Sequence, residues 1–173
     1  MNQVVLVNEN DEVIGTMFRD EAHEKRAPHR IAVIFVENNK GEILIQVRMS
    51  GKLDHSSAGH VDPGETYLQA AVRELKEELG IEGVNLVSIG KGKDNVPHFF
   101  EVFVCRSEPG VLQEEEVKSV YWAKPEDILK DMEKDPEKFT RGFVVSLGIY
   151  LKWKSEFDEE GHSLAVGAGQ DFK

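Results

Sequence analysis

The 173-residue sequence contains a single cysteine, Cys105. One thiol excludes an internal disulfide framework and a zinc site built from several cysteines. Because Cys105 lies in the apolar run EVFVCR, we expect it to be buried and inert. The scarcity of cysteine also predicts a reducing, cytoplasmic location.

Long apolar runs are absent as well. No run approaches the roughly 20 residues that a membrane-spanning helix needs. The opening residues, MNQVVLVNENDE, carry acids where a secretory signal would carry basic residues followed by a long apolar run. We therefore expect neither a secretory signal nor a membrane partner.

Positive charge is scarce relative to negative charge, with 21 Lys and Arg against 32 Asp and Glu and a net charge of -11. Such a balance argues against extended nucleic acid binding by broad electrostatics. An acidic protein can still bind anionic phosphates when metal ions mediate the contact. Clusters of carboxylates are therefore the first candidates for a functional site.

The order of predicted elements indicates an α/β fold. Residues 4–16 form a predicted hairpin, and residues 31–37 and 43–48 form a strand pair around the turn Asn38-Asn39-Lys40-Gly41. Residues 49–64 are predicted to be a loop, and further strands are predicted at 99–105 and 117–122. Helices are predicted at 66–79 and 125–134, with a longer one starting at Pro136.

Strands that alternate with helices imply a mixed β-sheet packed between helices. We expect one domain over residues 1–154, of which residues 1–30 form an N-terminal hairpin extension. Residues 155–173 have weak periodicity and much glycine, which predicts a flexible C-terminal tail.

The predicted helix at 66–79 has clear end signals and three distinct faces. Thr66 with Gln69 is typical of a capping box, and Gly80 is a suitable stop. One face concentrates negative charge at Glu74, Glu77 and Glu78, and the basic residues project elsewhere. The predicted apolar face comprises Leu68, Ala71, Val72, Leu75 and Leu79.

Like charges three or four residues apart on a helix repel by roughly 0.2–0.5 kcal/mol per pair. A divalent cation would turn this repulsion into attraction, and hard cations such as Mg²⁺ or Mn²⁺ prefer carboxylate oxygens. Gly59 and Gly64, in the loop before the helix, allow backbone carbonyls to point at the same ion. The pattern therefore favours a metal site that binds phosphates and activates water.

The stretch AGHVDPGETYLQAAVRELKEELGI resembles the signature of the Nudix hydrolases. Every fixed position of that 23-residue motif is matched, from Gly59 through Glu65 to the run RELKEELGI. The resemblance implies an α/β/α sandwich and a metal-dependent hydrolase that uses Mg²⁺ or Mn²⁺.

The resemblance also implies a role for each matched residue. Glu77 and Glu78 would be the main metal ligands, and Glu74 a further ligand or the base that deprotonates the attacking water. Arg73 would pair with a glutamate and orient it, Glu65 would brace the loop and helix, and the Ala58 carbonyl would be a backbone ligand. Gly59 and Gly80 would be structural. Many members have one more glutamate beyond the motif, for which this chain offers Glu115 or Glu116.

The wider sequence is similar to the isopentenyl-diphosphate isomerase branch of this superfamily. The similarity includes His23, His29 and the Gly-His at the start of the motif. Those isomerases use a cysteine before the Gly-His, a nearby tryptophan, and a metal held by three histidines and two glutamates. This chain has Ala58 at the cysteine position and no tryptophan in the loop, so hydrolysis is the favoured chemistry. Whether His23, His29 and His60 bind a metal is left open.

The leading hypothesis is a hydrolase that cleaves a diphosphate linkage in a nucleoside diphosphate joined to another moiety, ADP-ribose or similar, through a metal-activated water. Arg48, Lys52 and His60 are the candidate substrate contacts. An isomerase-like enzyme and a non-catalytic nucleotide-binding module are the alternatives. Formation of a homodimer is left open.

Overall fold

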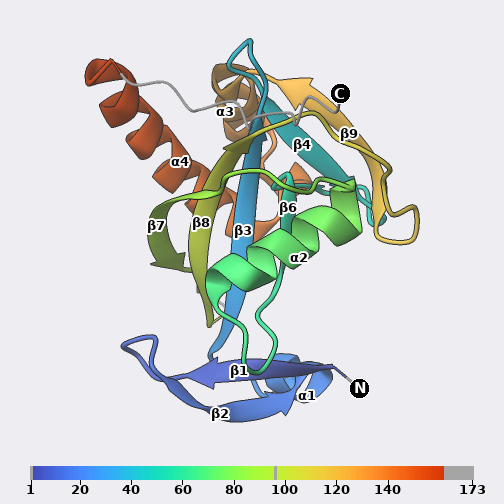
Figure 1. Ribbon diagram of the computed structural model, residues 1–173, viewed down its shortest axis with the longest axis vertical. Helices are drawn as coiled ribbons and strands as arrows, with labels where there is room; N and C mark the ends of the chain where they lie inside the picture. The colour runs from blue at the N-terminus through green and yellow to red at the C-terminus, as the bar shows by residue number, and fades with distance from the viewer. Residues whose placement is uncertain (1, 96, 162–173) are drawn as a thin grey trace, which may run out of the picture.

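The computed structural model describes residues 2–95 and 97–161 (Figure 1). The element bounds are β1 Gln3–Val7, β2 Val13–Phe18, α1 Arg19–Glu24, β3 His29–Glu37, β4 Ile43–Arg48, β5 Leu53–Asp54, β6 Ser57–His60, α2 Tyr67–Leu79, β7 Val87–Lys93, β8 His98–Arg106, β9 Val117–Ala123, α3 Pro125–Lys134, the 3-10 turn η1 Pro136–Lys138, and α4 Arg141–Glu159.

Strand β3 is the centre of a mixed sheet that has nine strands within the described residues. It pairs in parallel with β8 along its whole length and antiparallel with β6, whereas β4 pairs antiparallel with β9 and β5. The predicted strands on either side of the turn at 38–41 are both present. They share only one residue pair, Glu37 with Ile43, because each then takes other partners and the sheet divides.

The two faces of β3 carry two separate hydrophobic cores, as its alternating side chains require. Ala32, Ile34 and Val36 belong to the core beneath α2. Val33 and Phe35 belong to the core that also contains side chains of α3 and α4. Figure 1 shows α2 lying across one face of the sheet. The predicted α/β/α sandwich with a mixed sheet is confirmed.

The N-terminal extension is the predicted hairpin, β1 and β2, followed by the short helix α1. Leu6 of β1 pairs with His29 at the start of β3, which attaches the hairpin to the central strand. In Figure 1 this extension lies at one end of the molecule, below α2.

Strand structure is more extensive than the sequence predicts. The predicted loop at 49–64 contains β5 and β6. Strand β6 pairs with β3 and strand β5 pairs with β4, along edges that β3 and β4 do not use to pair with each other. Strand β7 was not predicted, since Gly90 and Gly92 interrupt its apolar pattern. Both glycines allow close packing: a Cβ on Gly90 would lie 2.9 Å from Ile149 of α4.

The C-terminal helix differs from its prediction at both ends. Pro136 begins only a 3-10 turn, and α4 begins at Arg141 after Thr140, whose hydroxyl accepts a hydrogen bond from the Phe143 amide. The helix continues to Glu159, so the first five residues of the predicted flexible tail are helical. Residues 162–173 lie outside the described part of the chain. None of the described helices is long and apolar enough to cross a membrane.

Candidate active site

Helix α2 begins and ends as its sequence predicts. The Thr66 hydroxyl accepts a hydrogen bond from the Gln69 amide at 3.2 Å, and the Gln69 side chain accepts one from the Thr66 amide at 2.8 Å. Gly80 adopts the left-handed conformation that ends the helix, with φ of 62°. Both predicted end signals of the helix are therefore present.

The buried face of α2 is rotated from the predicted apolar face. Leu68 and Val72 are 47% and 51% exposed, whereas Tyr67 and Ala70 are buried. Glu74 and Glu78 are also buried, at 9% and 6% exposure. The helix turns these two carboxylates toward β6, which moves the two aliphatic side chains to its outer edge.

The Glu74 carboxylate lies directly against the backbone of Gly59 on β6. A Cβ on Gly59 would be 2.0 Å from the carboxylate carbon, so the Glu74 side chain can keep this position only beside a glycine. Nη1 of Arg73 donates to Oε1 of Glu74 at 2.6 Å. Burial raises the pKa of Glu74 to about 7, against the lowering effect of Arg73 and with a further raising effect of the charge on Glu77.

Glu78 is held by three donors that all reach Oε2. They are the Ser57 hydroxyl at 2.6 Å, the Gln46 amide at 3.1 Å and the Ala58 backbone N–H at 3.3 Å. Burial raises the pKa of Glu78 to about 7 although these donors lower it. All of these hydrogen bonds from the described residues are accepted by Oε2, so the lone pairs of Oε1 remain available to bind a cation.

Arg73 connects the helix to the loop before it. Its guanidinium binds both carboxylate oxygens of Glu65, at 2.8 and 2.9 Å, and donates to the His60 carbonyl at 2.9 Å. A longer contact of 3.3 Å reaches Glu77. Glu65 in turn accepts a hydrogen bond from the Asp62 amide. These contacts are the ones expected if Arg73 pairs with glutamates and Glu65 braces the loop against the helix.

A cavity of about 870 Å³ opens beside α2 and brings together most of the predicted residues. The predicted residues that line it are Arg48, Ala58, Gly59, His60, Arg73, Glu74, Glu77, Glu78, Glu115 and Glu116. Glu115 and Glu116 come from the segment before β9, and the charge of Glu116 adds to the raised pKa of Glu74. Separated in sequence by about 40 residues, the two acidic segments therefore share one cavity.

Three predicted residues stand apart from the cavity wall. Lys52 is exposed in the turn after β4, so the structure does not bring it to the cavity. Glu65 acts through Arg73. Gly80 lies against the backbone of Val111, which a Cβ would approach to 2.8 Å. The structural role expected for Gly80 fits this contact.

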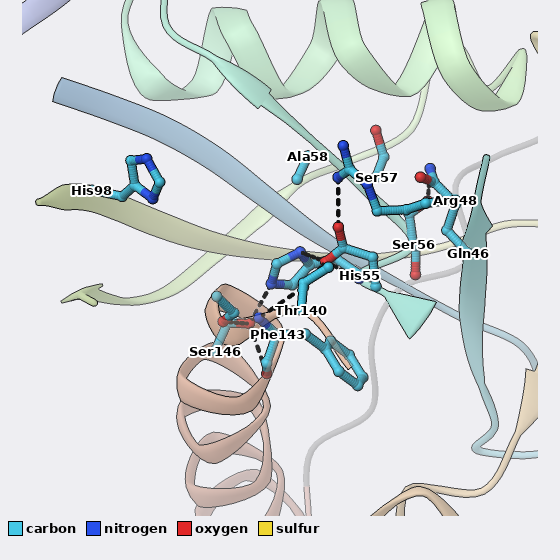
Figure 2. Close-up of polar contacts among 12 residues, drawn as sticks. Gln46, Arg48, His55, Ser56, Ser57, Ala58, His98, Thr140, Phe143 and Ser146 are labelled. Carbon is cyan, nitrogen blue, oxygen red and sulfur yellow. Dashed lines mark hydrogen bonds and ion pairs between the residues drawn. The ribbon is translucent and has the colours of Figure 1, made fainter. Parts of the chain in front are cut away.

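Sequence reasoning missed a polar network on the other side of the cavity, where β5 meets α4. Asp54 binds Arg48 at 2.8 Å and accepts a hydrogen bond from Thr140 at 2.7 Å. It also lies 2.7 Å from Nδ1 of His55, whose Nε2 is 2.5 Å from the Ser146 hydroxyl (Figure 2). The signal that could have located it was the polar run Asp54 to Ser57, which is buried although it lies between apolar strands.

Comparison with known proteins places this arrangement in a family. The model of the NUDIX domain matches residues 27–143, which is more than half of the chain. The chain belongs to the Nudix hydrolase family. This assignment confirms the resemblance of the motif at 59–81.

Individual relatives extend the similarity over most of this Nudix protein. It is 38% identical over 158 residues to the Nudix hydrolase YfcD of Salmonella typhi, covering 86% of this chain and 84% of the relative. It is 29% identical over 176 residues to the isopentenyl-diphosphate Delta-isomerase of Pectobacterium atrosepticum, covering 92% and 97%. The crystal structure of DR0079 from Deinococcus radiodurans superposes with a TM-score of 0.69 at 28% identity, covering 76% and 89%. The predicted isomerase-like branch is therefore confirmed.

Proposed function

We propose that this Nudix protein is a metal-dependent hydrolase that cleaves a diphosphate linkage in a nucleoside diphosphate joined to another moiety. The observation that carries the proposal is the pair of buried carboxylates, Glu74 and Glu78, on one wall of a large cavity. Burial disfavours both charges, so the pair is costly unless a cation offsets it.

The residues present fit a divalent metal ion. Glu74, Glu77 and Glu78 supply hard oxygen donors from one helix, and the second acidic segment supplies Glu115 and Glu116 across the cavity. Such an all-oxygen set suits Mg²⁺ or Mn²⁺. The motif implies a further ligand from the Ala58 carbonyl, and the neighbouring Ala58 N–H donates to Oε2 of Glu78 at 3.3 Å.

The protein side chains divide the chemical work. A cation, when bound, neutralises phosphate oxygens and lowers the pKa of water. Glu74 accepts a proton from the attacking water, since its carboxylate lies on the cavity wall beside the other two glutamates of α2. The water oxygen forms a bond to phosphorus as the bridging P–O bond breaks, and the leaving phosphate departs with the bridging oxygen. Arg73 keeps the Glu74 carboxylate in place.

The opposite wall supplies the contacts for the substrate. Arg48 is fixed by Asp54, and Arg141 lies at the start of α4, so both present positive charge to the cavity. A guanidinium matches the geometry of a phosphate group. The volume of about 870 Å³ is within the roughly 300–1,000 Å³ typical of small-molecule sites. ADP-ribose or a similar compound is the proposed substrate.

A panel of compounds tests the proposal. ADP-ribose, dinucleoside polyphosphates, nucleoside triphosphates and prenyl diphosphates are incubated with the protein and Mg²⁺ or Mn²⁺, and phosphate products are measured. Turnover of at least one diphosphate is expected, and Glu74→Gln and Glu78→Gln should each lower it by about 10²-fold or more. Glu82→Gln, an exposed position just after α2, is the matched control and should leave turnover unchanged. Absence of turnover on every compound, or full activity in both active-site variants, would contradict the proposal.

The isomerase alternative is separated by a second measurement. Ala58 presents a methyl group at the cavity wall and has no proton to donate to a double bond. Deuterium exchange into isopentenyl diphosphate is therefore expected to be absent. Exchange without hydrolysis of any panel compound would favour the isomerase reading, and tight binding without turnover would favour a non-catalytic module.

A further inference from the structure

Asp54, at the end of β5, is a buried acid whose two carboxylate oxygens bind different segments of the chain. Its exposed fraction is 5%. Oδ2 accepts a hydrogen bond from Nη1 of Arg48 at 2.8 Å, and Oδ1 accepts one from the Thr140 hydroxyl at 2.7 Å (Figure 2). A buried charge is costly unless it is paired, so this acid depends on both partners. Asp54 therefore joins the end of β4 to the start of α4.

Arg48 uses only one end of its guanidinium for this contact. Its side chain is 50% exposed, and it lines the cavity that also contains the α2 glutamates. Among the residues that the structure describes, Nε and Nη2 of Arg48 have no hydrogen-bond partner. A guanidinium carries five N–H donors in one plane, so the unused donors can bind a phosphate while Nη1 stays on Asp54. An arginine fixed in this way loses less rotamer freedom when a substrate binds.

Thr140 connects the same acid to the start of α4. Its hydroxyl donates to Asp54 and accepts a hydrogen bond from the Phe143 amide at 3.4 Å, so it also caps the helix. The Thr140 amide donates to the Leu53 carbonyl at 3.0 Å, which adds a backbone contact between β5 and α4. Arg141 follows Thr140 directly and lines the same cavity. The backbone that carries Arg141 is therefore attached to the residue that Asp54 binds.

The series Asp54, His55 and Ser146 has the residue types of a nucleophilic triad, but burial of the serine excludes that role. Nδ1 of His55 lies 2.7 Å from Asp54, and Nε2 lies 2.5 Å from the Ser146 hydroxyl. Ser146 is 0% exposed, and its hydroxyl is also 2.9 Å from the Gly142 carbonyl, so a substrate has no access to it. The His55 ring packs against Gly142, where an added Cβ would lie 3.7 Å away. These contacts support the cavity wall.

We propose that Asp54 is a positioning residue for the phosphate groups of the substrate. It holds the Arg48 guanidinium at the cavity and, through Thr140, attaches the start of α4 to the same point. The ligand that this arrangement suits is a diphosphate, whose oxygens can bind Arg48 and Arg141 from two elements. The inference rests on the proposed function for its substrate, but it involves none of the α2 glutamates. Asp54 thus contributes to substrate binding, measured by KM, and not to the chemical step, measured by kcat.

The test is a double-mutant cycle on the panel compound that is turned over fastest. Asp54→Asn keeps the size of the side chain, and its amide oxygen can still accept from Thr140, but its amino group cannot accept from Arg48. KM should rise by about 10-fold or more, with kcat changed by less than about 3-fold. Arg48→Gln should raise KM by a similar factor, and adding Asp54→Asn to it should change KM by less than about 2-fold. Asp127→Asn, which breaks an exposed ion pair with Lys130 on α3, is the matched control and should leave KM unchanged.

Two further measurements cover the remaining cases. A wild type that turns over no panel compound contradicts the proposed function; the proteins of the cycle are then titrated with α,β-methylene-ADP, a diphosphate that resists hydrolysis, and Kd replaces KM. If circular dichroism shows that Asp54→Asn does not fold, Arg48→Lys takes its place. An ammonium held by Asp54 offers no second pair of donors to a phosphate, so KM should rise as it does in Arg48→Gln.

The proposal is overturned if Asp54→Asn leaves KM or Kd within about 2-fold of the wild-type value, or raises it equally with and without Arg48. It is also overturned if the loss falls on kcat alone, or if Arg48→Lys binds the substrate as the wild type does. A wild type that neither turns over a compound nor binds the analogue overturns it as well. A purely structural Asp54 would lower Tm in both backgrounds without a change in KM that depends on Arg48.

Discussion

At the scale of single residues, Glu74 and Glu78 combine two properties that sequence alone could not show. They are acids on the charged side of a helix, and they are also buried against β6. Gly59 makes the burial of Glu74 geometrically feasible, and Ser57 and Gln46 supply donors for Glu78. The position of each carboxylate therefore depends on the strands opposite as much as on the helix.

Replacing Gly59 by alanine should displace the Glu74 carboxylate. The new Cβ would meet the carboxylate carbon at 2.0 Å, which forces the side chain or the strand to move. A misplacement of about 1 Å at a catalytic group can cost about 10²-fold, so kcat/KM should fall by that order. Steady-state kinetics on the substrate found in the panel provide the measurement. Gly15→Ala, which has no atom within 4 Å of the added Cβ, should retain full activity.

The raised pKa values of Glu74 and Glu78 predict how the stability of the metal-free protein depends on pH. Each pKa rises from 4.5 to about 7 on folding, so the folded state binds protons more tightly than the unfolded state. The stabilising contribution is thus full below about pH 4.5 and is lost as pH rises to 7 and beyond. Thermal unfolding in a chelator, between pH 5 and 8, should show Tm falling less in Glu78→Gln than in the wild type. An equal fall of Tm in the variant and the wild type would contradict the raised pKa of Glu78.

At the scale of elements, α4 is attached to the cavity wall by buried polar contacts. His55 connects Asp54 of β5 to Ser146 of α4, and Thr140, which caps the helix, also binds Asp54 (Figure 2). Arg48 shares the same carboxylate, whose pKa is held below its usual range by His55, Thr140 and Arg48 despite burial. The start of α4 and the cavity-lining Arg48 are therefore both bound by one acid.

Replacing Ser146 by alanine should destabilise the fold by about 1–3 kcal/mol, because Nε2 of His55 would be left buried without its partner. Chemical denaturation should show a lower midpoint with an unchanged slope. Ser155→Ala, an exposed position on the same helix, should change stability by less than about 0.5 kcal/mol. A midpoint for Ser146→Ala equal to that of the control would show that the contact contributes nothing.

At the scale of the whole molecule, the cavity lies where separate parts of the chain converge. Helix α2, the segment before β9, the end of β4 and the start of α4 all contribute to its wall. The division of the sheet after the single Glu37–Ile43 pair lets β4 carry Arg48 away from β3. The fold thus brings the glutamates of α2 and of the segment before β9 into one cavity with Arg48 and Arg141.

Divalent metal should stabilise the whole protein by binding the folded state alone. At a Mg²⁺ concentration 100 times the Kd, the gain is about 2.7 kcal/mol, which corresponds to a Tm increase of several degrees. The Glu74→Gln/Glu78→Gln double variant should lose most of this increase in differential scanning calorimetry, and Glu82→Gln should keep it. A Tm increase of the same size in the double variant would place the Mg²⁺ elsewhere.

Local structure was largely predictable from the sequence. The capping box at Thr66, the stop at Gly80 and the hairpin at 4–16 were confirmed because their signals lie within a few neighbouring residues. Burial of Cys105 was likewise confirmed. The predicted cytoplasmic location and the question of a homodimer stay untested by the fold.

Long-range structure was less accessible. Strand β7 was missed because its glycines remove the apolar pattern, and their purpose is visible only against Ile149 and Phe100. The predicted helix from Pro136 was wrong in its start, because the turn at 136–138 carries Phe139 to the core before α4 begins. Contacts between distant segments, which no local pattern encodes, decided both features.

The sequence by itself determined the family motif, the acidic face of α2 and the chemistry that those carboxylates favour. Only the tertiary structure decided which acids are buried, and that Arg48 reaches the cavity and Lys52 does not. It also decided that four histidines far apart in the sequence meet, namely His23, His29, His60 and His98. The physical reason is that a motif reports side chains a few residues apart on one element. Burial, charge pairing and ligand sets instead depend on strand register and on the packing of elements far apart in the chain.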